Sequence, residues 1–243
     1  MNKVKRVLLT VVSLVCVAAV LTGGVWCSRL DDTSACNRVD VVIEDSLVRS
    51  YVDADELVSY LQSRGCYSVG KQMEDIDCHA IEQTLLKHDM VRTVSCYKTP
   101  FGGVSVSVTQ RVPMLAVKSN GHIYLVDTDR RVMPCRAGMD KEVVVLTGNV
   151  GERAAQEEYY DFVAWIKQHD YWRSRLKACH VANPRQLVLS QYDYKAKIIL
   201  GPLDGYETKM NRLQRLYTKG FDVLGYPECK ELDLRYEGQV IKR

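Results

Sequence analysis

The sequence lacks the short motifs that mark most catalytic and metal-binding proteins. None of its nine cysteines is spaced as C-x-x-C, which argues against zinc ribbons and thioredoxin-like redox sites. Neither the H-E-x-x-H pattern of zinc proteases nor the G-x-S-x-G turn of serine hydrolases occurs. We therefore expect no catalytic residue, no metal and no cofactor, and a binding or scaffolding role becomes the default.

One segment nearly matches a phosphate-binding loop but lacks a required residue. Residues 65–71 fit the G-x-x-x-x-G-K pattern, but Gln72 stands where the motif needs a Ser or Thr to ligate magnesium. The segment also follows an expected helix, whereas a phosphate-binding loop follows a strand and begins a helix. The pattern is better explained as a helix end followed by a loop.

An excess of positive charge is also missing from the main part of the chain. Of 33 Lys and Arg residues, Lys3, Lys5 and Arg6 precede residue 7, which leaves 30 basic residues against 30 Asp and Glu. Nucleic-acid binding depends on a basic field that neutralises phosphates. A neutral chain of this kind argues against a nucleic-acid partner.

One long uncharged run is present near the N-terminus. Residues 7–26 carry no charge, and twenty helical residues span about 30 Å, the thickness of a hydrocarbon core. Basic residues precede the run and Asp31 and Asp32 follow it, so the positive-inside rule places residues 1–6 in the cytoplasm and the main part outside. The alternative is a cleaved signal peptide. Its apolar core would be shorter, and Trp26 before Cys27 makes a poor cleavage site.

The cysteines of an exported domain could form disulfides. Their spacing shows no dense framework, and a chain of this size can build a core without cross-links. We therefore expect most of them to be small, buried, apolar residues.

Residues 39–112 are predicted to fold as a β-α-α-β-β unit. Residues 39–43 alternate as a strand, Asp53 caps a helix that Gly65 ends, and Asp77 caps a second helix with Ile81, Leu85 and Met90 near one face. Strands at 91–97 and 104–108 form a hairpin around the Phe-Gly-Gly turn at 101–103.

Residues 113–243 are predicted to be richer in strands. Strands at 114–117 and 123–126 flank Asn120-Gly121, a strong hairpin signal. Further strands are expected at 143–146, 186–190 and 195–200, helices at 157–168 and 206–219 with Gly220 capping the second, and a terminal strand at 231–241 interrupted at Gly238.

In this order of features the chain resembles the bacterial cell-division family FtsQ/DivIB, in the form found in Bacteroidetes. Four stretches carry the resemblance: residues 73–86 in the second helix of a POTRA domain, 110–117 at the junction of two domains, 121–134 in the opening hairpin of the second domain, and 231–243 in its last strand. The resemblance implies an α+β protein with a cytoplasmic tail (1–6), a transmembrane signal anchor (7–27), a tether (28–38), a POTRA domain (39–112) and a β domain with supporting helices (113–243).

The resemblance also implies a function. Such a protein is a non-enzymatic component of the divisome, held in the inner membrane at the septum, that binds the partners FtsB and FtsL and helps to control septal peptidoglycan synthesis. The POTRA domain is expected to contact other division proteins. Two other functions compete with this one: a membrane-anchored POTRA scaffold of envelope assembly or secretion, and an anchored cell-wall enzyme.

The C-terminal strand is the expected partner-binding site. Residues 232–236 alternate, and the last strand of a chain is often a sheet edge whose unpaired N–H and C=O groups can pair with an incoming strand. Tyr236 is expected to be an aromatic anchor and Gly238 to allow close approach of the partner backbone. The predicted site comprises Leu234, Arg235, Tyr236, Gly238, Gln239 and Val240.

Overall fold

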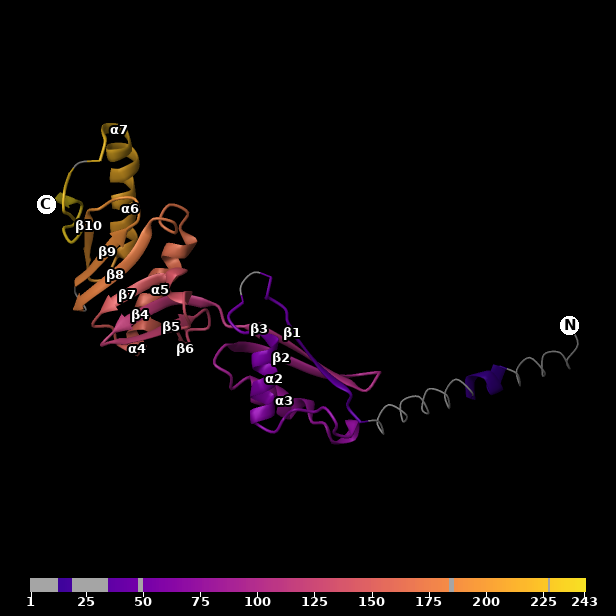
Figure 1. Cartoon of the computed structure of the whole chain (residues 1–243). Helices are drawn as coiled ribbons and strands as arrows, with labels where there is room; N and C mark the ends of the chain where they lie inside the picture. The colour runs from indigo at the N-terminus through magenta and orange to yellow at the C-terminus, as the bar shows by residue number, and fades with distance from the viewer. Residues whose placement is uncertain (1–12, 19–34, 48–49, 184–185, 227) are drawn as a thin grey trace, which may run out of the picture. The chain divides into compact units, whose positions relative to one another are not determined.

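The computed structural model describes residues 13–18, 35–47, 50–183, 186–226 and 228–243. The chain divides into two compact units, residues 1–110 and 111–243 (Figure 1). Residues 13–18 are helical. Within the described ranges, no helix has the length and apolar character needed to cross a membrane. The predicted tail, most of the predicted anchor and much of the tether lie outside these ranges.

The first unit is a three-stranded sheet with two helices on one face (Figure 1). Its elements are β1 (Arg38–Ile43), α2 (Ala54–Ser63), the short 3-10 helix η1 (Met73–Asp75), α3 (Cys78–Leu85), β2 (Val91–Thr99) and β3 (Gly103–Gln110). The strand order is β1-β3-β2, with β1 parallel and β2 antiparallel to the central strand β3. The predicted β-α-α-β-β order is confirmed.

The alternation of β3 explains the core of this unit. Val104, Val106 and Val108 are fully buried, while the serines between them are half-buried. Alternate side chains of a strand point to opposite faces, so the three valines share the face that the helices cover. Leu57 and Leu61 of α2 and Ile81 and Leu85 of α3 are the buried helical residues that complete this core.

Both predicted helix caps are present. A carboxylate oxygen of Asp53 accepts a hydrogen bond from the Glu56 N–H at 2.8 Å, and Asp77 accepts one from the Ala80 N–H at 3.0 Å. Each bond satisfies one of the N–H groups that a helix start leaves unpaired. Gly65, with φ +70°, follows the end of α2, so the near match to a phosphate-binding loop is a helix end and a loop.

The second helix is shorter than predicted. It ends at Leu85, so the buried Met90 lies beyond it. His88, also beyond the helix and 8% exposed, places its Nε2 3.3 Å from the Glu56 carboxylate.

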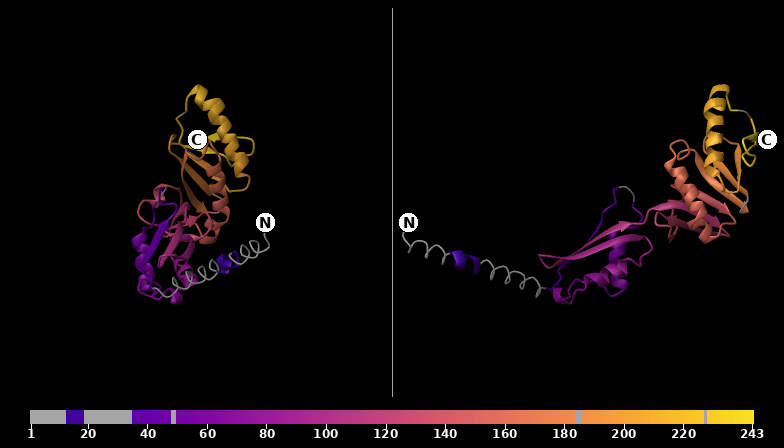
Figure 2. Two further views of the ribbon diagram at one scale, coloured as in Figure 1. Left: turned by 90° about the vertical axis from the view of Figure 1, so that its right-hand side faces the viewer. Right: turned by 180° about the vertical axis from the view of Figure 1, so that it is seen from behind.

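The second unit is a nine-stranded mixed sheet with helices on one face (Figures 1 and 2). Its strands are β4 (Pro113–Ser119), β5 (His122–Asp127), β6 (Val132–Pro134), β7 (Val144–Gly148), β8 (Leu176–Asn183), β9 (Gln186–Gln191), β10 (Lys197–Gly201), β11 (Glu231–Asp233) and β12 (Ile241–Lys242). Its helical elements are η2 (Met139–Lys141), α4 (Glu152–Gln156), α5 (Glu158–Gln168), α6 (Tyr206–Leu216), the π-helix η3 (Tyr217–Phe221) and α7 (Asp222–Leu224). The α+β class with a strand-rich second unit is confirmed.

The sheet order is β12-β11-β10-β9-β8-β7-β4-β5-β6. The β7–β8 and β10–β11 pairs are parallel, so the chain crosses over through α5 in the first case and α6 in the second. Phe162 of α5 lies edge-to-face against Tyr206 of α6, with ring centroids 5.2 Å apart. The first turn of α6 therefore packs against α5.

Asn120 and Gly121 form the predicted hairpin turn. Their φ angles are +53° and +79°, which the turn between β4 and β5 requires and which Asn and Gly adopt most readily. By contrast, β8, a central strand, was not predicted.

The predicted C-terminal end of α6 is wrong. Gly220 does not cap it; helical backbone continues through a widened π turn and α7, and Gly225, with φ +90°, follows the last helical residue. The rings of Tyr217 and Phe221, which bound this π turn, are stacked with centroids 5.4 Å apart. Continued packing of these two aromatic rings accounts for the extension past the glycine.

The predicted terminal strand is also wrong. β11 ends at Asp233, and the chain turns back so that β12 pairs antiparallel with it. β11 is therefore an inner strand between β10 and β12, and β12 forms the edge of the sheet. The alternation of residues 232–236 predicted that Leu234 and Tyr236 lie on one face of a strand, but Leu234 is buried in the core and Tyr236 is 46% exposed on the turn that follows β11.

The prediction that most cysteines are buried is wrong for those that the structure describes. Of the eight described cysteines, Cys36 and Cys179 are buried, Cys16 is exposed and the other five are intermediate. All eight are free thiols.

Candidate partner-binding site

The short strand β12 leaves one side of its backbone open. Glu231 and Arg243 exchange both of their backbone hydrogen bonds, at 3.1 and 2.9 Å. Hydrogen-bonded and non-bonded positions alternate in an antiparallel pair, so the N–H and C=O of Lys242 face away from β11. The open side of β12 is therefore available for pairing with another strand.

A buried carboxylate holds the hairpin of β11 and β12 together. Asp233 is fully buried and accepts two side-chain hydrogen bonds from Arg235, at 2.9 and 2.7 Å. An Arg243 guanidinium nitrogen lies 3.3 Å from the same carboxylate. These arginines, Arg235 above all, hold the pKa of Asp233 below its ordinary value of 3.8. The carboxylate thus joins the end of β11 to the last residue of the chain.

Gly201 makes room for the Arg235 side chain. It has φ +77° at a register shift between β9 and β10. A Cβ atom built on Gly201 would lie 2.7 Å from Cγ of Arg235, closer than atoms can approach. The absence of a side chain here lets Arg235 lie across β10 and reach Asp233.

Arg212 of α6 holds the turn between β11 and β12. Its Nη1 donates to the backbone oxygens of Tyr236 and Gln239, at 2.6 and 2.8 Å. Two carbonyls held by one guanidinium fix the turn on which Tyr236 stands. A hollow of about 510 Å³ opens beside the turn, lined by Thr208, Asn211, Arg212, Arg215, Glu237 and Gly238.

A POTRA-like domain model matches residues 34–109, and a model described as FtsQ/DivIB, C-terminal related, matches residues 112–242. The chain belongs to the FtsQ/DivIB family. A search of curated proteins found no match. The predicted resemblance is confirmed, and the FtsQ/DivIB domains indicate a role in cell division.

In this FtsQ/DivIB chain the predicted site residues fall into three groups. Tyr236, Gly238 and Gln239 lie together on the exposed turn, and Gly238 has φ +72° there. Leu234 and Val240 instead contribute to the core, and the Leu234 N–H donates to the Ile199 oxygen at 2.9 Å. Arg235 is half-exposed but is bound to Asp233. A partner could therefore cover the turn residues and the exposed part of Arg235, but not Leu234.

Sequence reasoning missed the residues that hold this surface of the FtsQ/DivIB chain in place. Arg212 lies on the polar face of an amphipathic helix, where an arginine is ordinarily solvated. Gly201 and Arg243 carry no local signal of their own. Asp233 gave the one usable sign, since it is a charged residue within an apolar strand pattern.

Proposed function

We propose that this protein is a non-enzymatic scaffold of the cell-division machinery. A signal anchor at residues 7–27 holds it in the inner membrane at the septum, with residues 1–6 in the cytoplasm and both folded units in the periplasm. The support for the cell-division role is the match of the second unit to the FtsQ/DivIB C-terminal related model, preceded by a unit that matches a POTRA-like domain. The support for the anchor is the uncharged run and the charge asymmetry around it.

The C-terminal edge of the sheet binds an extended segment of an FtsB- or FtsL-type partner. The observation that carries this proposal is the open side of β12 next to the exposed turn at Tyr236. Backbone bonds to the edge supply affinity, and side chains of the turn supply selectivity. Because β12 has only two residues, pairing must extend along the segment that leads into it. Through this contact the scaffold links early and late division proteins and contributes to control of septal peptidoglycan synthesis.

Tyr236→Ala tests the binding site. The ring is 46% exposed, so its removal leaves the core intact, while truncation of a central aromatic anchor typically costs about 2 kcal/mol or more of binding free energy. We expect the affinity for the periplasmic segments of the partners, measured by calorimetric titration, to fall by about thirtyfold or more. Tyr192→Ala is the matched control, because Tyr192 is 64% exposed in the same unit. Unchanged affinity in the Tyr236 variant, with native circular dichroism, would exclude the tyrosine as an anchor.

Two further measurements test the location at the septum and the membrane anchor. A fluorescent fusion should form bands at midcell in dividing cells. N-terminal sequencing of the mature protein should find no cleavage after Trp26; a mature chain that begins beyond this residue would exclude the anchor.

A further inference from the structure

The β2–β3 hairpin of the first unit ends in an uncharged tip that carries an exposed aromatic ring. Its residues are Thr99, Pro100, Phe101, Gly102 and Gly103. Phe101 is 83% exposed, and Tyr97, four residues before it, is 56% exposed. A large aromatic side chain standing in water at a hairpin tip is unusual for a chain whose core absorbs most of its aromatic residues.

The fold places this tip where the chain enters the first unit. β1 runs parallel to β3, with Arg38 opposite Gly103, so both strands begin at the same end of the sheet (Figure 1). Just before β1, the N–H of Asn37 donates to the Gly102 oxygen at 2.8 Å, and its side-chain amide donates to the Phe101 oxygen at 2.9 Å. The incoming chain is therefore fastened directly to the tip.

A second loop shares this end of the unit. The Cys36 N–H donates to the Lys71 oxygen, and the Gly70 N–H donates to the Cys36 oxygen, each at 2.8 Å. This loop carries Val69, which is 40% exposed. Three cationic side chains lie around the tip and the loop, and each also has a partner within this unit. The Lys71 ammonium donates to the Gly65 oxygen at 3.1 Å, the Lys98 ammonium donates to the Met73 oxygen, and Arg38, which packs beside Gly103, pairs with Asp40 at 3.0 Å.

We propose that this end of the first unit rests on the bilayer, with Phe101 inserted at the membrane interface. The inference rests on the proposed anchor at residues 7–27. The link from Cys27 to Asn37 has about ten residues and can span at most about 36 Å, which keeps the tip within reach of the membrane surface. A short link of this kind makes insertion an intramolecular event at an effective concentration in the millimolar range.

The chemistry of the tip suits a lipid surface. Aromatic side chains favour the headgroup region, and lysine and arginine beside them can bind anionic headgroups while their chains lie along apolar surface. Insertion would hold the first unit at a fixed height above the membrane and restrict its rotation about the tether.

Phe101→Trp in the full-length chain, reconstituted into vesicles of phosphatidylcholine and phosphatidylglycerol, tests the proposal. Phosphatidylcholine brominated in its acyl chains quenches tryptophan at close range. The control is Leu47→Trp: Leu47 is 98% exposed and lies beyond the opposite end of β1, since the Glu44 N–H bonds to Val108 at the far end of β3. The native tryptophans are the same in both variants and in the unsubstituted chain.

The indole added in Phe101→Trp should have blue-shifted emission that is lost in brominated vesicles. The indole added in Leu47→Trp should keep the emission wavelength of a water-exposed tryptophan. Quenching of the native Trp26 in the unsubstituted chain reports that the anchor has inserted. If Trp26 is quenched but the two added indoles behave alike, the interface proposal is overturned and the anchor stands. If the unsubstituted chain does not float with the vesicles, the anchor fails and this inference fails with it.

Discussion

The two ends of the nine-stranded sheet each contain a buried aspartate, but the arginines around them differ in exposure. At the end formed by β5 and β6, Asp127 is 1% exposed and its partner Arg111 is 12% exposed. At the end formed by β11 and β12, Asp233 is fully buried, whereas Arg235 and Arg243 are 39% and 48% exposed. The ion pair at the β5–β6 end is thus enclosed, whereas the arginines that pair with Asp233 at the β11–β12 end remain accessible to water.

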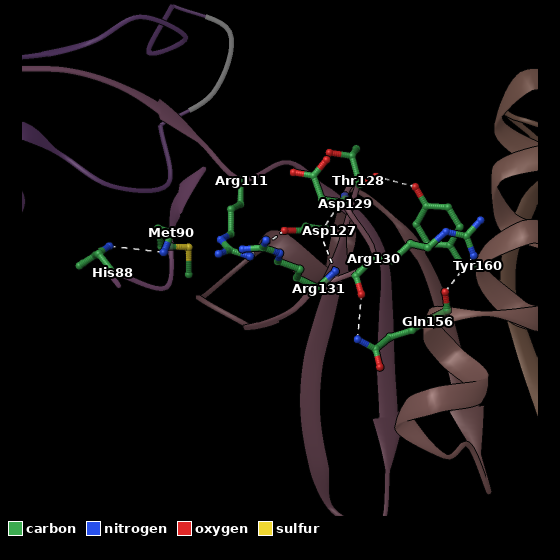
Figure 3. Close-up of polar contacts among 10 residues, drawn as sticks. All are labelled: His88, Met90, Arg111, Asp127, Thr128, Asp129, Arg130, Arg131, Gln156 and Tyr160. Atoms are coloured by element: carbon green, nitrogen blue, oxygen red, sulfur yellow. Dashed lines mark hydrogen bonds and ion pairs between the residues drawn. The ribbon is translucent and has the colours of Figure 1, made fainter. Parts of the chain in front are cut away.

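Several hydrogen bonds converge on Asp127 at the first of these ends (Figure 3). Asp127 accepts hydrogen bonds from the N–H groups of Asp129 and Arg131, each at 2.8 Å, and from the Arg111 side chain at 3.0 Å. The Tyr160 hydroxyl donates to the Thr128 oxygen at 2.9 Å, and the Arg130 guanidinium lies over the Tyr160 ring. One carboxylate therefore organises the turn between β5 and β6 and the start of the second unit.

Asp127→Ala should have the largest effect on stability. The substitution removes a buried carboxylate that accepts from the N–H groups of Asp129 and Arg131 and from Arg111, whose side chain is 12% exposed, and breaking a buried pair of this kind typically costs about 3–5 kcal/mol. We expect the free energy of unfolding of the second unit to fall by about this amount in urea titrations followed by the fluorescence of Trp165 and Trp172. Asp161→Ala is the control, since its pair with Arg130 is 58% and 44% exposed and should contribute less than about 1 kcal/mol. Equal losses in the two variants would contradict this account.

Asp233→Ala should cost less, although Asp233 is as deeply buried. Arg235 and Arg243 are exposed enough to turn into water when the carboxylate is removed, so no enclosed charge remains. We expect a loss of about 2 kcal/mol, the scale of hydrogen bonds to a charged group. Amide hydrogen exchange should quicken in residues 231–243 and stay slow in β4 and β7. A loss as large as that of Asp127→Ala would show that exposure of the arginines does not set the difference.

Arg212→Met should have a still smaller effect on stability. The substitution keeps most of the apolar length of the side chain and removes the two bonds to the turn. We expect about 1 kcal/mol or less of stability to be lost, with faster exchange at Gln239 and weaker partner binding. Arg215→Met, one turn along the same helix and lining the same hollow, is the matched control. If Arg215→Met weakens partner binding as much, positive charge beside the hollow, rather than the hold on the turn, is what matters.

The sequence predicts best where local chemistry and packing agree. The valines of β3 alternate perfectly, and Asp53 and Asp77 each provide the cap that their helix needs. The sequence does not predict β8 because the pairing of this strand with β9 is irregular. Register shifts after Leu176 and Val181 interrupt the two-residue alternation by which a strand is recognised.

The candidate site was harder to predict because its contacts are distant in sequence. The alternation at residues 232–236 is real, but it says nothing of the turn that folds β12 back onto β11. That turn is held by Arg212, 24 and 27 residues before its two acceptors, and by the space at Gly201. Tyr236 was proposed as a partner-facing residue through the family resemblance, and its role in binding stays a prediction.

The change in stability of the β11–β12 end with pH should be the smallest of these effects. The hydrogen bonds from Arg235 hold the pKa of Asp233 below its ordinary value of 3.8, so the folded state favours the ionised carboxylate. The resulting stabilisation is fully present above the ordinary value and is lost as the pH falls through the lowered value of the folded state. The stability difference between the unsubstituted chain and Asp233→Asn should therefore be constant between about pH 5 and pH 8 and shrink at lower pH. Other carboxylates titrate in the same range, but they are common to both chains and cancel in the difference.

Because Arg235 and Arg243 remain accessible to water, we expect residues 231–243 to lose their protection from amide hydrogen exchange gradually as the pH falls. The second unit should not unfold cooperatively when this loss begins. A difference that stays constant well below the ordinary value would show that the arginines do not favour the ionised form.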